Sequence, residues 1–366
     1  MIRAVIRTVL LFGGRSAEHE VSILSARSIA DAVSKDRIEI IPICIARDGR
    51  FVDPEKSAHI LAGEEKSEAG HPGFSFETWS RSHHIDIVFP MIHGTSGEDG
   101  TLQGYLDLLG LPYVGSGVTA SAIGMDKVHM KHAFAAAKLP MVEYVAVQER
   151  EWRHERDRVT RAVANALRLP YFVKPANAGS SIGVTKVKSD RDLDAAVEHA
   201  LRFDEKVLVE RGVDAREIEV SVLGNESAEA SVPGEILAGR EFYDYADKYI
   251  EDKSQLVIPA KLTKERTDEI RKLGVGAFKA IGASGYARVD FFLERGTNKL
   301  FVNEINTVPG FTKISMYPKL WEATELKYPR LIERLIQLGL DRAKSRTERM
   351  ESAMKWLDEV KPLTQS

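Results

Sequence analysis

The sequence has few of the features that stabilise secreted or membrane proteins. Its only cysteine is Cys44, so no disulfide can form within the chain, and the apolar run 40–45 around it predicts a buried structural thiol rather than a nucleophile. No apolar run approaches the ~20 residues that a membrane-spanning helix needs. The first residues are interrupted by Arg3 and Arg7 and lead into Gly13-Gly14, which indicates a first strand and not a signal peptide. We therefore expect a cytoplasmic protein without a membrane partner.

An excess of charge of one sign is absent as well. The chain has 51 lysines and arginines against 54 acidic residues, a net charge of −3 with neutral histidines. This balance gives no general electrostatic reason to bind nucleic acid, so we expect no such partner. The 43% of hydrophobic and 29% of charged residues are typical of a globular protein, and 366 residues suffice for two or three domains.

The first third of the chain has the pattern of an open α/β domain with a parallel sheet. Strands are predicted at 8–12, 38–45 and 85–92. Ser16 follows the first strand and is expected to cap a helix that runs to about Asp31. The polar stretch 55–73 lacks periodicity and is predicted to be a loop. In domains of this type, ligands bind at the carboxyl ends of the strands.

A small α+β domain is predicted in the middle of the chain. A helix that carries Met125-Asp126-Lys127 leads into it and is ended by Pro140. Its strands are expected at 171–174, 184–187 and 207–210. The strongly charged helix 150–168 is interpreted as a solvated face, and we assign it no function.

The last third is predicted to contain a second sheet, an amphipathic helix at 263–281 and a closing helix at 328–340. The irregular stretch 241–255 interrupts this sheet and is expected to be a long loop. The predicted domains are 1–119, 120–210 and 211–345, followed by a charged tail at 346–366 that is helical or disordered.

The stretch Gly285–Gly310 is predicted to be a hairpin that presents charged side chains on one face. Arg288 and Asp290 lie two residues apart on its first strand, so they share a face. Glu304 and Asn306 do the same on its second strand. Two carboxylates and an amide suit a hard cation such as Mg²⁺. Taken alone, the pattern also fits a surface hairpin with a solvated polar face.

A second candidate site is the loop Lys174–Gly183, KPANAGSSIG, which follows a predicted strand. Its small residues let backbone N–H groups approach a phosphate closely, and Lys174 supplies positive charge. The lysine precedes the glycines, so the loop is not a Walker A motif. A flexible surface turn is the alternative interpretation.

Together these features resemble the ATP-grasp ligases and, within that superfamily, the D-alanine–D-alanine ligases. The resemblance spans roughly residues 9–340. It rests on motifs in a fixed order: GGRSAEHEVS (13–22), HGTSGEDGTLQG (93–104), MDK (125–127), KPANAGSSIGV (174–184), FYDYADKY (242–249), RVD (288–290) and NEINTVPGFT (303–312). It implies a three-domain ATP-grasp fold of mixed α/β and α+β class, with an N-terminal open parallel-sheet domain, and it implies a homodimer.

The resemblance implies a nucleotide site shared between several loops. The residues implied to contact ATP are Lys127, Lys174 and Lys248 at the phosphates, Ser180 and Ser181 in the phosphate loop, Glu210 and Val213 at the adenine edge, and Glu217 at the ribose. The residues implied to hold two Mg²⁺ ions, with Mn²⁺ as an alternative, are Asp290, Glu304 and Asn306. A monovalent cation requirement is left open. Taken singly, Lys127, Glu210 and Glu217 also fit exposed surface charges.

The resemblance also implies a site for a first D-alanine. Glu18 would bind its ammonium group, and Ser180 would link Glu18 to Tyr249 through hydrogen bonds. His93 would lie near the same substrate; a histidine with satisfied hydrogen bonds at a strand end is the alternative. A tyrosine at position 249 favours the dipeptide D-alanyl-D-alanine over D-alanyl-D-lactate.

A second D-alanine would be received by Ser315 and Met316. The implied reaction activates the first D-alanine as an acyl phosphate, which the amine of the second attacks. Arg288 and the backbone N–H of Gly310 would stabilise the oxyanion, and the loop 241–255 would close as a lid. The product would serve peptidoglycan synthesis. A D-alanyl-D-lactate ligase is the enzyme alternative, and a catalytically inactive ATP-binding scaffold is the alternative from another class.

Overall fold

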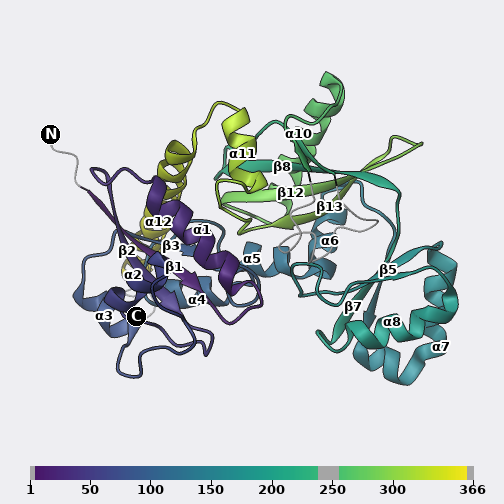
Figure 1. The fold of residues 1–366 in the computed structure, drawn as a ribbon, viewed down its shortest axis with the longest axis horizontal. Helices are drawn as coiled ribbons and strands as arrows, with labels where there is room; N and C mark the ends of the chain where they lie inside the picture. Colours follow the sequence, from purple (N-terminus) through teal and green to yellow (C-terminus); the bar gives the residue numbers. More distant parts are fainter. Residues whose placement is uncertain (1–4, 238–254, 361–366) are drawn as a thin grey trace.

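The structure, a computed structural model, describes residues 5–237 and 255–360. The described residues form three sheets that follow one another along the chain, with helices packed on their faces (Figure 1). Within the same ranges, no helix is both long and apolar enough to cross a membrane.

The first sheet is parallel, as the alternation of strands and helices predicts. Its strands, in the order β2-β1-β3, are β1 (Ile6–Gly13), β2 (Ile38–Ile45) and β3 (Ile87–Met91). The helices of this part are α1 (His19–Ala32), α2 (Pro54–Ala62), α3 (Phe76–Ser82) and α4 (Thr101–Leu108). Because β1 and β3 are neighbours and run in the same direction, the turns that follow them meet at one edge of the sheet. These turns carry Glu18 and His93.

Two local predictions in this part are wrong. The stretch 55–73 is not all loop, because α2 begins at Pro54 and Asp53 caps it by accepting a hydrogen bond from the N–H of Lys56 at 3.0 Å. An aspartate followed by proline at the first helical position is a start signal that we overlooked. Ser16 does not cap α1, which begins at His19; its hydroxyl donates to the carbonyl of His93 at 2.7 Å instead.

Cys44 is fully buried in β2, as predicted. Burial, with a smaller contribution from the charge of Glu20, raises the pKa of its thiol to about 12. The thiol is therefore structural and not a nucleophile.

The second sheet is antiparallel and has the order β4-β7-β5-β6. Its strands are β4 (Tyr144–Gln148), β5 (Tyr171–Pro175), β6 (Thr185–Val187) and β7 (Lys206–Arg211). Its helices are α7 (Glu149–Ala166) and α8 (Leu193–Ala200), the latter preceded by a 3-10 turn at Asp190–Asp192. The charges of α7 form surface ion pairs, such as Arg153 with Glu198 at 2.6 Å, which agrees with a solvated face.

The third sheet has the order β11-β10-β8-β12-β13, with β9 paired to β8. Its strands are β8 (Ala215–Gly224), β9 (Glu229–Ala230), β10 (Gly234–Leu237), β11 (Gln255–Val257), β12 (Gly285–Glu294) and β13 (Leu300–Asn306). Around it lie α5 (Val118–Met125), α6 (Lys127–Ala136), α10 (Lys264–Ala280) and α11 (Met316–Ala323).

The predicted single helix through 125–127 is in fact two helices. Asp126 interrupts it and caps α6 by accepting hydrogen bonds from the N–H groups of Val128 and His129. Met130 and Phe134 then pack α6 against the core of the third sheet, although the second sheet is nearer in sequence. The amino end of α6, with Lys127, thus lies where the second and third sheets approach each other (Figure 1).

The predicted hairpin is confirmed. Its register places Arg288 opposite Asn306 and Asp290 opposite Glu304. On the other side of β12, Asp290 lies opposite Glu219 of β8. Directly paired residues point to the same face of a sheet, so this face gathers most of the charge that the sequence predicts there.

The chain closes with one continuous helix, α12 (Tyr328–Val360). Its first half returns to the first sheet, where Leu331 and Leu335 share a core with Leu10 and Phe89 (Figure 1). The prediction that this helix ends near residue 340 is wrong. Over the described residues the charged tail is helical, which is one of the two alternatives predicted for it.

Candidate active site

A cavity of about 1270 Å³ is lined by residues from all three parts of the chain. Every predicted site residue within the described ranges lines it: Glu18, His93, Lys127, Lys174, Ser180, Ser181, Glu210, Val213, Glu217, Arg288, Asp290, Glu304, Asn306, Gly310, Ser315 and Met316. The polar face of the hairpin and the loop after β5 therefore open into a shared cavity. Lys248 and Tyr249 lie outside the described residues, as does all of the expected lid 241–255 except Gln255, which begins β11.

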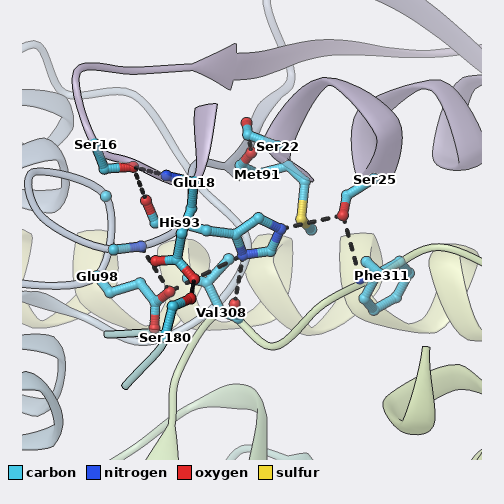
Figure 2. Close-up of polar contacts among 12 residues, drawn as sticks. Ser16, Glu18, Ser22, Ser25, Met91, His93, Glu98, Ser180, Val308 and Phe311 are labelled. Atoms are coloured by element: carbon cyan, nitrogen blue, oxygen red, sulfur yellow. Dashed lines mark hydrogen bonds and ion pairs between the residues drawn. The ribbon is translucent and has the colours of Figure 1, made fainter. Parts of the chain in front are cut away.

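Glu18 lies where the first sheet meets the loop Lys174–Gly183 (Figure 2). The hydroxyl of Ser180 donates a hydrogen bond to its carboxylate and so connects the two regions. Two glycines leave room for this carboxylate: a Cβ on Gly94 would come within 2.6 Å of Glu18 Oε2, and one on Gly179 within 3.0 Å. A carboxylate held at this place can bind an ammonium group.

His93 fixes the loop that follows the hairpin. Its Nδ1 lies 2.8 Å from the carbonyl oxygen of Val308, and its Nε2 lies 3.1 Å from the hydroxyl of Ser25 (Figure 2). Burial lowers the pKa of His93, so we assign a neutral ring that donates to Val308 and accepts from Ser25. Ser25 Oγ in turn accepts the N–H of Phe311 at 3.3 Å. These contacts match the alternative interpretation of His93, a histidine whose hydrogen bonds are satisfied. The ring also lines the cavity, as the substrate interpretation requires.

Glu98 is a buried carboxyl group that we did not single out from the sequence. Its Oε1 accepts the N–H of Gly94 at 2.9 Å and lies 3.9 Å from His93 Nδ1 (Figure 2). Burial, followed by the negative charge of Glu18, raises the pKa of Glu98 to about 8. At neutral pH Glu98 is therefore largely protonated, and the negative charge here resides on Glu18.

The loop after β5 has the geometry of an anion site. Ser180 and Ser181 both have positive φ angles, 49° and 61°, which are uncommon outside glycine and typical of concave backbone that binds anions. Lys127 reaches this loop from the start of α6, since its Nζ donates to the carbonyl of Ala178 at 2.7 Å. The two lysines predicted at the phosphates, Lys127 and Lys174, thus approach the loop from different elements.

Lys131, Glu210 and Lys174 form a row of ion pairs behind the loop. Glu210 Oε1 lies 2.5 Å from Lys131 Nζ, and Oε2 lies 2.6 Å from Lys174 Nζ. Lys131 is 1% exposed and Glu210 2%. Burial alone would raise the pKa of Glu210, but the charges of the two lysines outweigh burial and lower it to about 2. Two cations and one anion leave the row a net charge of +1, which Lys174 presents to the cavity.

Arg288 dominates the charged face of the hairpin. Its Nε and Nη2 donate to the two oxygens of Asp290 at 2.7 and 2.6 Å, and its Nε lies 3.1 Å from Glu219. Asn306 donates to the same carboxylate of Asp290 at 3.1 Å. The negative charges of Asp290 and Glu219 stabilise the positive guanidinium of Arg288 in the cavity wall.

The donor set of this face fits a divalent cation. Three carboxylates (Glu219, Asp290 and Glu304) oppose the single guanidinium of Arg288, which leaves a net charge of −2 close to the anion site. Such a face would repel a triphosphate unless cations lay between them. Among the described residues no group of three or more His, Cys, Asp or Glu could hold a metal by itself. Two carboxylates with Asn306, completed by water and phosphate, match the ligands of Mg²⁺.

The cavity ends near the start of α11. Ser315 precedes this helix, and a Cβ on Gly310 would come within 3.1 Å of its hydroxyl. Met316 is the first helical residue and packs on Ile236. Free N–H groups at a helix start attract carboxylates, so this end suits the carboxylate of a small amino acid.

Three residues of the site were missed from the sequence: Glu98, Lys131 and Glu219. Lys131 follows Lys127 by four residues, a spacing that aligns side chains along a helix. Glu219 follows Glu217 by two residues, which places both on one face of a strand. Glu98 lies inside the motif HGTSGEDGTLQG. Each therefore had a signal that could have been used.

Known proteins are similar to this chain in both sequence and fold. The family model described as D-ala D-ala ligase N-terminus matches residues 7–116, and that described as D-ala D-ala ligase C-terminus matches residues 133–337. A D-alanine–D-alanine ligase of Halothermothrix orenii is 49% identical, over 92% of this chain and 98% of the relative. The structure of the D-alanine–D-alanine ligase from Coxiella burnetii has a TM-score of 0.82 and 36% identity, covering 97% of this chain and 99% of that one.

A second similar structure is that of a ligase named for a different second substrate. The VanG D-Ala:D-Ser ligase from Enterococcus faecalis has a TM-score of 0.80 and 32% identity, covering 92% of this chain and all of that one (100%). The family models nevertheless span most of the chain, and the relatives are matched over nearly their full length. The chain therefore belongs to the D-alanine–D-alanine ligase family and has its ATP-grasp fold.

Proposed function

We propose that this chain joins two D-alanine molecules into D-alanyl-D-alanine at the expense of ATP, releasing ADP and phosphate, for peptidoglycan synthesis in the cytoplasm. One observation carries the proposal: Glu18, the lysines around the phosphate loop and Arg288 all line one cavity. That arrangement supports a reaction between a small amino acid and a nucleotide. Membership of the family supplies the substrate class.

In the proposed mechanism Glu18 binds the ammonium of the first D-alanine, and Ser180 keeps Glu18 in place through its hydrogen bond. The substrate carboxylate attacks the γ-phosphorus of ATP, so ADP leaves and an acyl phosphate forms. Lys127 and Lys174 hold the phosphates. Glu210 and Val213 lie at the adenine edge and Glu217 at the ribose, where each lines the cavity.

The second half of the reaction forms the peptide bond. The amine of the second D-alanine, whose carboxylate lies at Ser315 beside Met316, attacks the carbonyl carbon of the acyl phosphate. The carbonyl oxygen becomes an oxyanion, to which Arg288 and the N–H of Gly310 donate. The C–O bond to phosphate then breaks, and inorganic phosphate leaves with the proton that the new amide nitrogen gives up. His93 holds the loop of Gly310 in position through Val308.

Asp290, Glu304 and Asn306 would hold two Mg²⁺ ions, or Mn²⁺ in their place. When bound, these ions neutralise the charge of the β- and γ-phosphates as the phosphoryl group moves. The net negative charge of this face supports the assignment. A homodimer and the roles of Lys248 and Tyr249 remain expectations from the resemblance, which leaves a monovalent cation requirement open.

Phosphate release tests the proposed reaction. The purified chain with ATP and Mg²⁺ is expected to release phosphate with D-alanine and not with L-alanine or without an amino acid, because Glu18 and Arg288 must engage the substrate together. The dipeptide should appear in a one-to-one ratio with phosphate. Phosphate release independent of D-alanine would contradict the ligase, and no release at all would favour the inactive scaffold.

The identity of the second substrate can be tested separately. With D-alanine present, addition of D-serine or D-lactate is expected to leave D-alanyl-D-alanine as the main product at neutral pH, because the Halothermothrix orenii relative, at 49% identity, is named for that product's two substrates. Mass spectrometry of the products measures the ratio directly. A majority of D-alanyl-D-serine would move the chain towards the specificity that the VanG structure is named for.

A further inference from the structure

Lys319 is a cation of the cavity wall that the proposed reaction leaves unused. It lies on α11, is partly buried and lines the same cavity as Ser315 and Met316. A charge in a partly buried wall interacts more strongly with a bound ligand than a charge in open water does, because the effective dielectric constant is lower there. Its neighbours indicate which group of a ligand this charge can meet.

The other cations of the cavity wall have partners within the described ranges. The pairs are Lys127 with the carbonyl of Ala178, Lys174 with Glu210, Lys186 with the ring of Phe172, Arg211 with Glu143, and Arg288 with Asp290. The side chain of Lys319, by contrast, has no ion pair or hydrogen bond to any described residue. Its positive charge is therefore available to a ligand that carries a negative charge.

The geometry of α11 places this charge beside Ser315. The N–H of Lys319 donates to the carbonyl of Ser315 at 3.3 Å, so the two residues lie one turn apart. Side chains of a helix lean toward its amino end, which brings the lysine back over Ser315. Met316 and Leu320 occupy the neighbouring face, where they pack with Ile236. Ser315, Lys319 and Met316 thus share the side of α11 that meets the cavity.

The ligand expected at this end of the cavity is an anion. In the proposed reaction the second D-alanine places its carboxylate at Ser315, whose hydroxyl accepts the N–H of Thr312 at 3.0 Å. A hydroxyl group can bind a carboxylate but does not neutralise it. Arg288 is held by two carboxylates and is directed at the oxyanion, so it does not supply the charge. Among the described residues at this end of the cavity, Lys319 can supply it.

We propose that Lys319 binds the carboxylate of the second amino acid through an ion pair and thereby selects acceptors with a free carboxylate. The inference rests on the proposed function, because it assigns a residue to the second substrate of that reaction. It adds a substrate-binding residue to Ser315 and Met316. Binding of ATP and of the first D-alanine should be unaffected, since their expected contacts come from other elements.

Competition between two acceptors tests the second site alone. D-alanine and D-alaninamide are supplied together with ATP and Mg²⁺, and the products D-alanyl-D-alanine and D-alanyl-D-alaninamide are measured by mass spectrometry. D-alaninamide has no carboxylate to phosphorylate, so it can serve only as the second substrate, and both products contain the same first residue. Their ratio reports the discrimination between the two acceptors. Changes in ATP affinity or in the amount of folded enzyme cancel in this ratio.

Lys319→Met is expected to lower the ratio of dipeptide to dipeptide amide by at least about tenfold, because only the carboxylate loses an ion pair. Lys319→Arg keeps the charge and should stay within about threefold of the wild type. Lys313→Met is the matched control: this lysine precedes α11, is exposed and does not line the cavity, so the ratio should not change. An unchanged ratio in Lys319→Met, or an equal fall in Lys313→Met, would overturn the proposal.

The same experiment separates this inference from the proposed reaction. If the wild type forms neither product, the proposed reaction fails and the inference falls with it. If the wild type forms the dipeptide and Lys319→Met leaves the ratio unchanged, the reaction stands and only the role of Lys319 is refuted. A fall of both products in equal proportion would also refute that role, because Lys319 would then support folding or ATP binding instead of the acceptor.

Discussion

Arg288→Ala is expected to lower kcat by about 10²–10³, with the affinity for ATP staying within about threefold, because the guanidinium acts on the oxyanion that exists only after the nucleotide has bound. In the structure Arg288 is held by Asp290 and Glu219 in the wall of the cavity. The proposed mechanism directs it at the carbonyl oxygen instead. Kinetics with D-alanine give kcat, and binding of a non-hydrolysable ATP analogue gives the affinity.

Controls must separate catalysis from folding. Removal of Arg288 leaves two carboxylates without their cation, which costs stability, so thermal unfolding should be measured and the assays run well below the melting temperature. Arg288→Lys keeps the charge but loses the planar fork, and an intermediate kcat is expected. Arg295→Ala removes an exposed arginine from the turn after β12 and should change neither quantity. If Arg288→Ala weakens ATP binding as much as it slows turnover, Arg288 acts in nucleotide binding or in folding and not on the oxyanion.

The sequence predicted those parts of the site that depend on local periodicity. The hairpin is one case: the two-residue spacing of Arg288 and Asp290 places both on one face whatever the rest of the chain does. The pairing of Asp290 with Glu219 was not accessible in the same way, because it depends on β8 lying beside β12 although 71 residues separate these two side chains along the chain. The spacing of Glu219 from Glu217 indicates which face of the strand it lies on, but only the tertiary neighbour shows that this face meets Asp290.

The boundaries of the helices were predicted less well, and for a physical reason. Asp126 can continue a helix or cap a new one, and the choice depends on whether the chain must turn to bring α6 onto the third sheet. The predicted end of the closing helix near 340 rests on the charged character of the tail that follows it. Charged residues with good helix propensity nevertheless continue it to Val360.

The buried row behind the phosphate loop has the second large effect. Lys131→Met is expected to weaken ATP binding roughly ten- to hundredfold, because the remaining Glu210 and Lys174 then cancel and the row loses its net positive charge. Lys131 is the buried end of the row and does not line the cavity, so this loss would occur without removal of an expected nucleotide contact. Isothermal titration with a non-hydrolysable ATP analogue measures the affinity. Lys272→Met on the exposed side of α10 is the matched control and should have no effect.

A second substitution decides whether charge or packing is responsible. In the double variant Lys131→Met with Glu210→Gln, the row again carries +1, now on Lys174 alone, so ATP affinity should return to within about threefold of the wild type. Glutamine keeps the shape of Glu210 and leaves its backbone at the adenine edge. If Lys131 served only to fill space, both variants would bind ATP equally weakly. If ATP affinity recovers only in the double variant, the buried Lys131 must act on the phosphates through the charge of Glu210. Neither residue reveals this link by its position in the sequence.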